Sequence, residues 1–212
     1  MKTLVIETST AACSVALIES GAVIARRHDV VGRGHAERLI PMIAELPAGG
    51  RAGHILVDCG PGSFTGIRVG IAAARALGFG WGAAVHGFST LPLIAAAAFA
   101  ERADLSALAV IMEGGHGEVF IQAFTRSPFA AIGPFASLRP DAALAALDGR
   151  AAFGTGVRHL QSLAPGIDAA EMLPDAATAI LLGADFATLP ARPIYGRAPD
   201  AKPPAPRMGV PA

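Results

Sequence analysis

The chain has 212 residues, a formal net charge of zero, 52% hydrophobic residues and only 16% charged residues. This length can enclose a real core, and so few charges argue against a disordered chain. The balanced charge also argues against a protein that grips nucleic acid by itself, because phosphate binding needs a surplus of clustered Lys and Arg. What remains is a globular protein with an unusually apolar surface, or one whose surface is covered by a partner.

Cysteine content and the apolar runs indicate a cytoplasmic protein. Two cysteines, Cys13 and Cys59, are too few for a disulfide scaffold, so a reducing compartment is expected. Glu7 ends the first apolar run, which argues against a signal peptide. The most apolar stretch, 71–100, is interrupted by Arg75 and several glycines, so we expect no membrane span.

The first half of the sequence predicts strands followed by helices, from short apolar runs bounded by turn residues and from helically spaced apolar residues. The expected strands lie at 3–6, 14–19, 21–27 (edge-like) and 54–58, with a strand or turn over 86–91. The expected helices lie at 35–46, at about 64–79 with Ser63 as N-cap, and at 92–101.

The second half repeats the opening layout: an apolar strand that ends in an acid, a small-residue turn, and a returning strand. The expected strands lie at 108–113 and 118–124, with a strand entering a turn at 152–156, and the expected helices at 142–147 and 176–186. We therefore expect a first lobe over 1–102, a smaller related lobe over 103–190, and a proline-rich, extended or mobile tail over 191–212.

The strongest local motif is a glycine-rich loop between a strand and a helix, containing Gly60, Gly62 and Ser63. Such a loop can turn its backbone N–H groups toward an anion. It lacks the Lys-Ser/Thr pair of a Walker A motif and the spacing of a dinucleotide fingerprint. A tight β–α turn with a capped helix is the simpler interpretation, and both stay open.

The following helix carries small residues at every fourth position. They form a flat ridge of Gly66, Gly70, Ala74 and Gly78, continued by Gly82. Each glycine inside a helix costs roughly 0.8–1 kcal/mol relative to alanine, so close packing must offset that cost. The ridge predicts contact either with the chain's own sheet or with a partner helix, and Arg68 and Arg75 could rim such an interface.

The opening turn is another candidate site. Glu7 ends a strand and is followed by Thr8, Ser9 and Thr10, the layout of phosphate hairpins in actin-like and sugar-kinase-like folds. We interpret it as a vestigial phosphate hairpin. Serine and threonine are also common in turns that bind nothing, so an ordinary turn stays open.

Four stretches in this order resemble the TsaB (YeaZ) family: 4–17, 35–43, 60–70 and 87–91. The most specific is Gly-Pro-Gly-Ser-Phe-Thr-Gly-x-Arg-x-Gly at 60–70. The resemblance covers about the first 100 residues closely and continues weakly to 193–197. It implies an α/β, actin-like (ASKHA, ribonuclease H-like) fold of two related lobes.

The resemblance also implies a non-catalytic role in making threonylcarbamoyladenosine next to the tRNA anticodon. The implied partners are a TsaD-like catalytic subunit and a TsaE-like ATPase, with tRNA bound only through the complex. ATP and Mg²⁺ are expected at the partner subunits, and no cofactor or metal on this chain alone. The catalytic relative carries a metal-binding histidine pair that this sequence lacks, which indicates a pseudoenzyme.

In that family the helix that corresponds to 66 to about 80 makes the pairing with TsaD and the homodimers. This implies a partner surface that contains Gly66, Arg68, Gly70, Ala74, Arg75 and Gly78. The sequence does not decide whether the free chain is a homodimer.

The sequence departs from the family at two places. Glu7 stands where the family usually has Asp, and 113–116 stand where it usually has Asp-Ala-Arg. Two other functions stay open: an ATP-dependent phosphotransferase that uses the Glu7 hairpin, and a metalloprotease, which would need a metal site.

Overall fold

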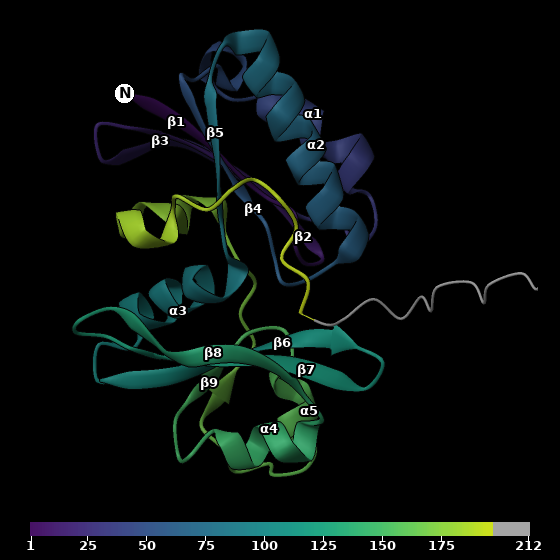
Figure 1. Cartoon of the computed structure of the whole chain (residues 1–212), viewed down its shortest axis with the longest axis vertical. Helices are drawn as coiled ribbons and strands as arrows, with labels where there is room; N and C mark the ends of the chain where they lie inside the picture. The colour runs from purple at the N-terminus through teal and green to yellow at the C-terminus, as the bar shows by residue number, and fades with distance from the viewer. Residues whose placement is uncertain (197–212) are drawn as a thin grey trace, which may run out of the picture.

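The computed structural model describes residues 1–196, which form two α/β lobes stacked along the long axis of the molecule (Figure 1). Each lobe is built on a five-stranded mixed sheet. One helix, α3 (Thr90–Glu101), lies between the two sheets, and the other helices cover their outer faces. The α/β class and the two lobes predicted from the sequence are thus confirmed.

The first sheet has the order β3-β2-β1-β4-β5. Its strands are β1 (Lys2–Glu7), β2 (Ala12–Glu19), β3 (Ala22–Val30), β4 (His54–Asp58) and β5 (Ala84–Phe88). β1 pairs with β2 antiparallel and with β4 parallel, so the ends of β1 and β4 meet at one edge of the sheet. The helices on its outer face are α1 (His35–Ala44) and α2 (Phe64–Trp81).

The second sheet repeats this topology, in the order β10-β9-β6-β7-β8. Its strands are β6 (Ala107–Gly115), β7 (Glu118–Thr125), β8 (Ala130–Leu138), β9 (Ala152–Phe153) and β10 (Ala169–Ala170). Two short helices, α4 (Pro140–Ala146) and α5 (Val157–Gln161), stand where α1 and α2 stand in the first lobe. The internal repeat expected from the sequence is therefore present in the strand order.

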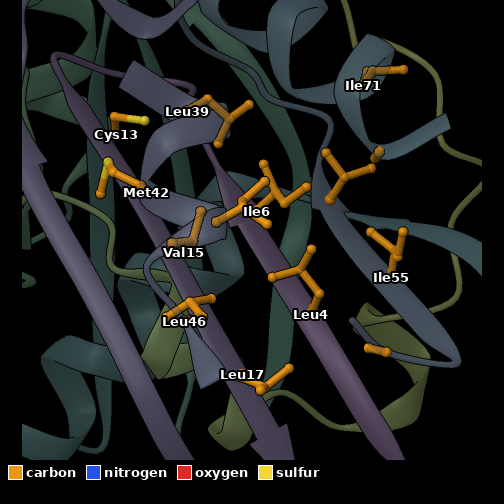
Figure 2. Packing of buried hydrophobic residues seen from close by; sticks show 14 of the residues in the cluster. Leu4, Ile6, Cys13, Val15, Leu17, Leu39, Met42, Leu46, Ile55 and Ile71 are labelled. Carbon is orange, nitrogen blue, oxygen red and sulfur yellow. The ribbon is translucent and has the colours of Figure 1, made fainter. Parts of the chain in front are cut away.

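The outer core of the first lobe lies between its sheet and helices α1 and α2 (Figure 2). Alternate residues of each strand point to this face, such as Leu4 and Ile6 of β1, and meet Leu39 of α1 and Ile71 of α2. Burying each such side chain fully stabilises the fold by about 1.5–3 kcal/mol. The strand periodicity of two and the helix periodicity of 3.6 thus place the apolar side chains of both kinds of element in the space between sheet and helices.

The helix α3 is apolar all round because it is covered on two sides. Leu93 packs with Val5 and Leu56 of the first sheet. Leu91 and Ile94, on another side of the helix, pack with the second sheet. The two lobes are therefore joined through α3, which contributes side chains to one core cluster on each side.

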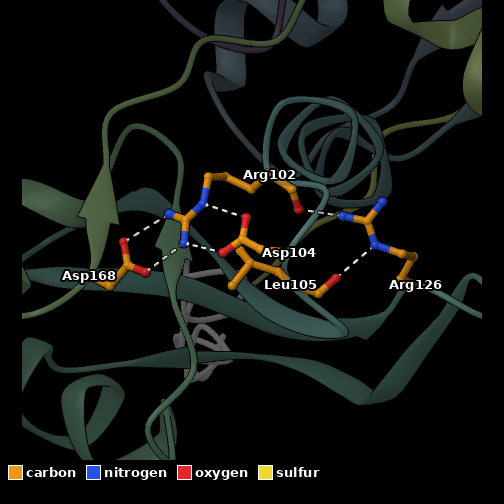
Figure 3. A network of polar contacts seen from close by, with 5 residues as sticks. All are labelled: Arg102, Asp104, Leu105, Arg126 and Asp168. Carbon is orange, nitrogen blue, oxygen red and sulfur yellow. Dashed lines mark hydrogen bonds and ion pairs between the residues drawn. The ribbon is translucent and has the colours of Figure 1, made fainter.

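A polar network fastens the C-terminal end of α3 to the second lobe (Figure 3). The Arg102 guanidinium donates to both carboxylate oxygens of Asp104 and of Asp168, at 2.9–3.1 Å. Arg126 donates to the carbonyl oxygens of Leu105 and Arg102. This network fixes where the chain leaves the shared helix.

Several elements differ from the sequence prediction. The strand β8 and the short α5 and β10 were not predicted. The helix expected over 176–186 is wrong: two 3-10 segments, η2 (Ala176–Leu181) and η3 (Ala184–Phe186), stand there, separated at Leu182 and Gly183. A further 3-10 turn, η1 (Pro47–Gly50), follows α1.

The segment that follows β10 returns to the first lobe. Ala176 and Ala179 of η2 pack against the first sheet, although they follow the second lobe in sequence. The segment 187–196, called here the return strap, continues along the first lobe and bridges to β5 between Leu189 and Gly87. Of the expected tail, 197–212 lie outside the described residues. Within 1–196 no helix is both long and apolar enough to cross a membrane.

Candidate functional site

The turn at 8–11 and the glycine-rich loop at 59–63 are bound to each other at the ends of β1 and β4. The Ser63 amide donates to the Ser9 carbonyl at 2.6 Å, and the Thr8 hydroxyl donates to the Gly66 carbonyl at 2.8 Å. A Cβ at Gly62 or Gly66 would collide with a carbonyl oxygen of the 8–11 turn. Glycine is thus needed for close approach of two backbones.

The glycine-rich loop is a tight β–α turn. Ser63 accepts from the Gly66 amide at 3.2 Å, which confirms its prediction as N-cap of α2. The Gly60 amide donates to Asp58 Oδ1 at 2.6 Å. Because the Gly60 and Ser63 N–H groups are both used inside the fold, the loop does not offer them to an anion.

Glu7 does not reach solvent. Its side chain is 0% exposed, and its Oε1 accepts from the Ser9 amide at 2.5 Å and from the Ser9 hydroxyl at 2.6 Å. The Thr10 hydroxyl accepts from the Ala12 amide at 3.1 Å. The acid and the hydroxyls of the expected hairpin are therefore all hydrogen-bonded within the fold.

Asp58, which the sequence analysis did not single out, is a second buried acid at the same place. It is 0% exposed, and its Oδ1 also accepts from the Thr90 hydroxyl at 2.7 Å. Burial raises the pKa of Asp58 from 3.8 to about 7. Burial and then the charge of Asp58 raise the pKa of Glu7 well above 4.5.

A cleft of about 830 Å³ opens between the lobes, next to the contact between the 8–11 turn and the glycine-rich loop. Its upper wall is made by the 8–11 turn, the start of α2 and the turn before α1, and its lower wall by the β6–β7 turn and α5. Residues of the upper wall include Ser9, Thr10, Arg33 and Ser63, and those of the lower wall include Glu113, His116, Arg158 and Glu171.

The lower wall carries its own ion pairs. Arg158 donates to Glu113 Oε1, and His159 Nε2 lies 3.3 Å from the same oxygen. Glu113, at the place where the family pattern is departed from, is therefore held by α5. The cleft can admit a small polar ligand. Glu7 would not contact such a ligand, because Glu7 is not among the residues that line the cleft.

The small-residue ridge of α2 contacts the chain's own sheet, one of the two contacts that its spacing left open. Gly66, Gly70, Ala74 and Gly78 are all buried against the chain's own sheet. A Cβ at Gly70 would collide with the Thr8 hydroxyl, and one at Gly78 would collide with Val85 of β5. The close packing that offsets the cost of these glycines is therefore internal.

The opposite face of α2 is open to solvent. Phe79 is 93% exposed and Phe64 is 65% exposed. Between them lie Ala72 and Ala76, which are exposed and, with Gly80, are again spaced four apart. We call this surface the outer face of α2 and define it by Phe64, Thr65, Arg68, Ala72, Arg75, Ala76, Phe79 and Gly80.

The return strap anchors both arginines of the outer face. Arg68 donates to the Tyr195 hydroxyl at 2.7 Å, and Arg75 donates to the Ala191 carbonyl at 2.6 Å. The Ile194 amide donates to the Cys59 carbonyl at 2.8 Å, which ties the strap to the glycine-rich loop. The 191–196 part of the expected tail is thus hydrogen-bonded to the first lobe.

Comparison with solved structures identifies the family. A crystal structure from Pseudomonas aeruginosa, described as similar to peptidase YeaZ, has a TM-score of 0.78 at 30% identity, covering 92% of this chain and 99% of that one. The chain belongs to the TsaB/YeaZ family. YeaZ from Pseudomonas aeruginosa has a TM-score of 0.77 to this TsaB/YeaZ member at 29% identity, with the same coverage.

Sequence comparisons agree with this assignment. TsaB of Escherichia coli, described as a tRNA threonylcarbamoyladenosine biosynthesis protein, is 36% identical over 133 residues, 59% of this chain and 56% of that one. TsaB of Haemophilus influenzae is 43% identical over 103 residues, 45% of this chain and 42% of that one. The matches thus span about half the length of these curated relatives.

The family model of TsaD, tRNA N6-adenosine threonylcarbamoyltransferase, matches residues 28–128. This stretch contains α1, α2 and α3. Within residues 1–196 no group of three or more His, Cys, Asp and Glu side chains is placed to hold a metal ion.

Sequence reasoning missed three features of this region. Asp58 reads as the last residue of an apolar strand, and its closeness to Glu7 comes only from the parallel pairing of β1 and β4. Phe64 and Phe79 lie on the expected helix, but its spacing does not state that their face meets solvent. Tyr195 lies in a proline-rich segment with no periodicity to place it.

Proposed function

We propose that this chain is a non-catalytic scaffold or activating subunit of the complex that transfers a threonylcarbamoyl group to the tRNA adenosine next to the anticodon. In this proposal it binds a TsaD-like catalytic subunit through the outer face of α2. A TsaE-like ATPase joins the pair, and tRNA is bound through the complex.

The observation that carries the proposal is the exposure of two phenylalanines on one helix face. Phe79 and Phe64 are 93% and 65% exposed, with the exposed Ala72 and Ala76 between them and Gly80 next to Phe79. Aromatic and arginine side chains around small residues are typical of interface hot spots, because they bury large areas while the small residues admit a close helix.

The match of residues 28–128 to the TsaD family supports the choice of partner. A catalytic subunit of that family would carry a helix corresponding to α2. Two related subunits can pack their corresponding helices around a pseudo-twofold axis, as identical subunits do around a true one. The same face also supports a homodimer of the free chain.

The geometry at the end of β1 supports a non-catalytic role. The Glu7 carboxyl is buried and bound by Ser9, so an ATP-dependent phosphotransferase would lack its expected acid at the cleft. The zero net charge supports tRNA binding by the partner subunits. ATP and Mg²⁺ are accordingly placed on those subunits in this proposal.

A reconstituted reaction tests the proposal. A TsaD-like subunit, a TsaE-like ATPase, ATP, threonylcarbamoyl-adenylate and tRNA are mixed with and without this chain, and modified adenosine is quantified. We expect product only when the chain is present, and little with Phe79→Asp. Leu163→Asp is the matched control, because Leu163 is also exposed (55%) but lies in the second lobe. Product formation without the chain would refute the proposed role.

A further inference from the structure

The two buried acids near the cleft do not have enough hydrogen-bond donors among the described residues. Glu7 and Asp58 are both 0% exposed. Each uses one carboxyl oxygen fully, while Glu7 Oε2 and Asp58 Oδ2 have no hydrogen-bond partner among the described residues. Ser9 donates to Glu7 and also interacts with Asp58, which places the two carboxyl groups on either side of one hydroxyl.

No cation compensates the pair among the described residues. The charged group that acts on it from a third element is Asp175, at the N-cap of η2, and it adds further negative charge. Asp175 itself is paired with Arg26 and His28 of β3. The thiols of Cys13 and Cys59 are also within electrostatic reach, but burial raises the pKa of each to about 12, so they stay neutral.

Two ionised carboxyl groups at this place would each be buried without a counter-charge, and they would repel each other. A carboxyl group that keeps its proton is neutral, so one retained proton removes the second buried charge and the repulsion between the two acids.

We propose that the Glu7–Asp58 pair keeps one proton at neutral pH, and that this proton holds the 8–11 turn against the 59–63 loop because it prevents repulsion between the two acids. Both loops contribute to the upper wall of the cleft, and the second begins α2. Loss of the proton at alkaline pH therefore loosens the start of α2. This proposal does not depend on the proposed function.

The stability of the folded chain should fall as pH rises, because folding raises the pKa values of both acids. The pKa of Asp58 is raised from 3.8 to about 7, and that of Glu7 is raised well above 4.5. The folded state therefore holds protons where the unfolded chain has lost them. The contribution of the two acids to stability is greatest below their pKa values in the unfolded chain, and it falls as pH rises toward their pKa values in the folded chain. Over that range the equilibrium constant for unfolding rises about tenfold per pH unit for each proton that only the folded state holds.

Glu7→Gln provides the sharpest variant. The two Ser9 donors hold the amide oxygen at the position of Oε1, so the amide nitrogen takes the position of the unpaired Oε2. The variant thus removes one ionisable group from the pair and keeps the shape of the side chain. Glu37→Gln, at an exposed position of α1, is the matched control for loss of one carboxyl group.

Thermal melting of the full chain is measured from about pH 5 to about pH 9. We expect the wild type to lose stability relative to Glu7→Gln as pH rises, and Glu37→Gln to follow the wild type. Parallel profiles for wild type and Glu7→Gln would overturn the proposal.

Infrared spectroscopy provides a readout that does not depend on any variant folding. At about pH 7 exposed carboxyl groups are ionised, so a carbonyl band of a protonated carboxyl group reports a buried one. We expect this band in the wild type and in Glu37→Gln, and a weaker band in Glu7→Gln, where Asp58 is the remaining buried acid. A wild-type spectrum without the band at neutral pH would also overturn the proposal.

Discussion

The guanidinium group of Arg68 lies over the ring of Phe64, with 3.2 Å between its central carbon and the ring centroid. The same guanidinium donates to the hydroxyl of Tyr195, so helix α2 and the return strap present one connected surface. Arg68 and Phe64 sit one helical turn apart, where side chains on the same face meet. This arrangement preorganises the N-terminal end of the outer face of α2.

Arg68→Ala is expected to weaken binding of a TsaD-like subunit about 30-fold or more, because truncating an interface hot spot costs about 2 kcal/mol or more. Isothermal titration with the purified subunit measures the change. Thermal stability of the free chain should change little, because the side chain is exposed. Arg33→Ala is the control, since Arg33 is exposed at the cleft and away from the outer face. Equal affinities for Arg68→Ala and wild type would remove Arg68 from the interface.

The two faces of α2 predict opposite effects of adding one methyl group. Gly66→Ala forces a Cβ against the Thr8 carbonyl, so we expect it to lower the free energy of unfolding by about 1–3 kcal/mol. Gly80→Ala meets nothing within 4 Å and should raise it by up to about 1 kcal/mol, through helix propensity. Urea unfolding of both variants measures the difference. If both substitutions stabilised the chain, the inward orientation of Gly66 would be wrong.

The two thiols are expected to be unreactive in the folded chain. Cys13 and Cys59 are 0% exposed, and burial raises the pKa of each to about 12. Because the thiolate is the reactive form, an aromatic disulfide reagent at about pH 8 should label neither thiol in the native protein. Both should be labelled at once in denaturant. Rapid labelling of native Cys59 would indicate that the 59–63 loop opens, contrary to its hydrogen bonds with the strap and the turn.

The sequence predicted the first lobe closely because its signals agree at several levels. Ser63 marks the start of α2, and Gly82, with φ of 67°, marks its end. Strand β4 was predicted with its observed bounds from one apolar run. In such segments turn chemistry, periodicity and burial all specify the same element.

The second lobe was predicted less well because its signals conflict. Strand β8 contains Gly133 and Pro134, which read as a break in any regular element. The structure tolerates them because β8 is an edge strand, where a missing N–H leaves no interior ladder bond unmade. The 176–186 segment has helical composition, but Gly183 interrupts it and it winds as 3-10 turns.

The candidate site shows the limit of periodicity. A spacing of four residues states that Gly66, Gly70 and Gly78 share a face, but it does not state what that face meets. Only the position of α2 over β1 and β5 decides that the face is internal. Likewise, Glu7 and Asp58 are far apart in sequence, and only strand pairing brings them together.

Titration calorimetry with Phe79→Asp tests directly whether the outer face of α2 binds a TsaD-like subunit. Phe79 is 93% exposed, so the substitution places a charge in the interface without disturbing the core. Wild type and Leu163→Asp should bind the TsaD-like subunit with the same affinity. Phe79→Asp should show no measurable heat of binding at the same concentrations. Binding of Phe79→Asp with wild-type affinity would contradict the proposed role of this face.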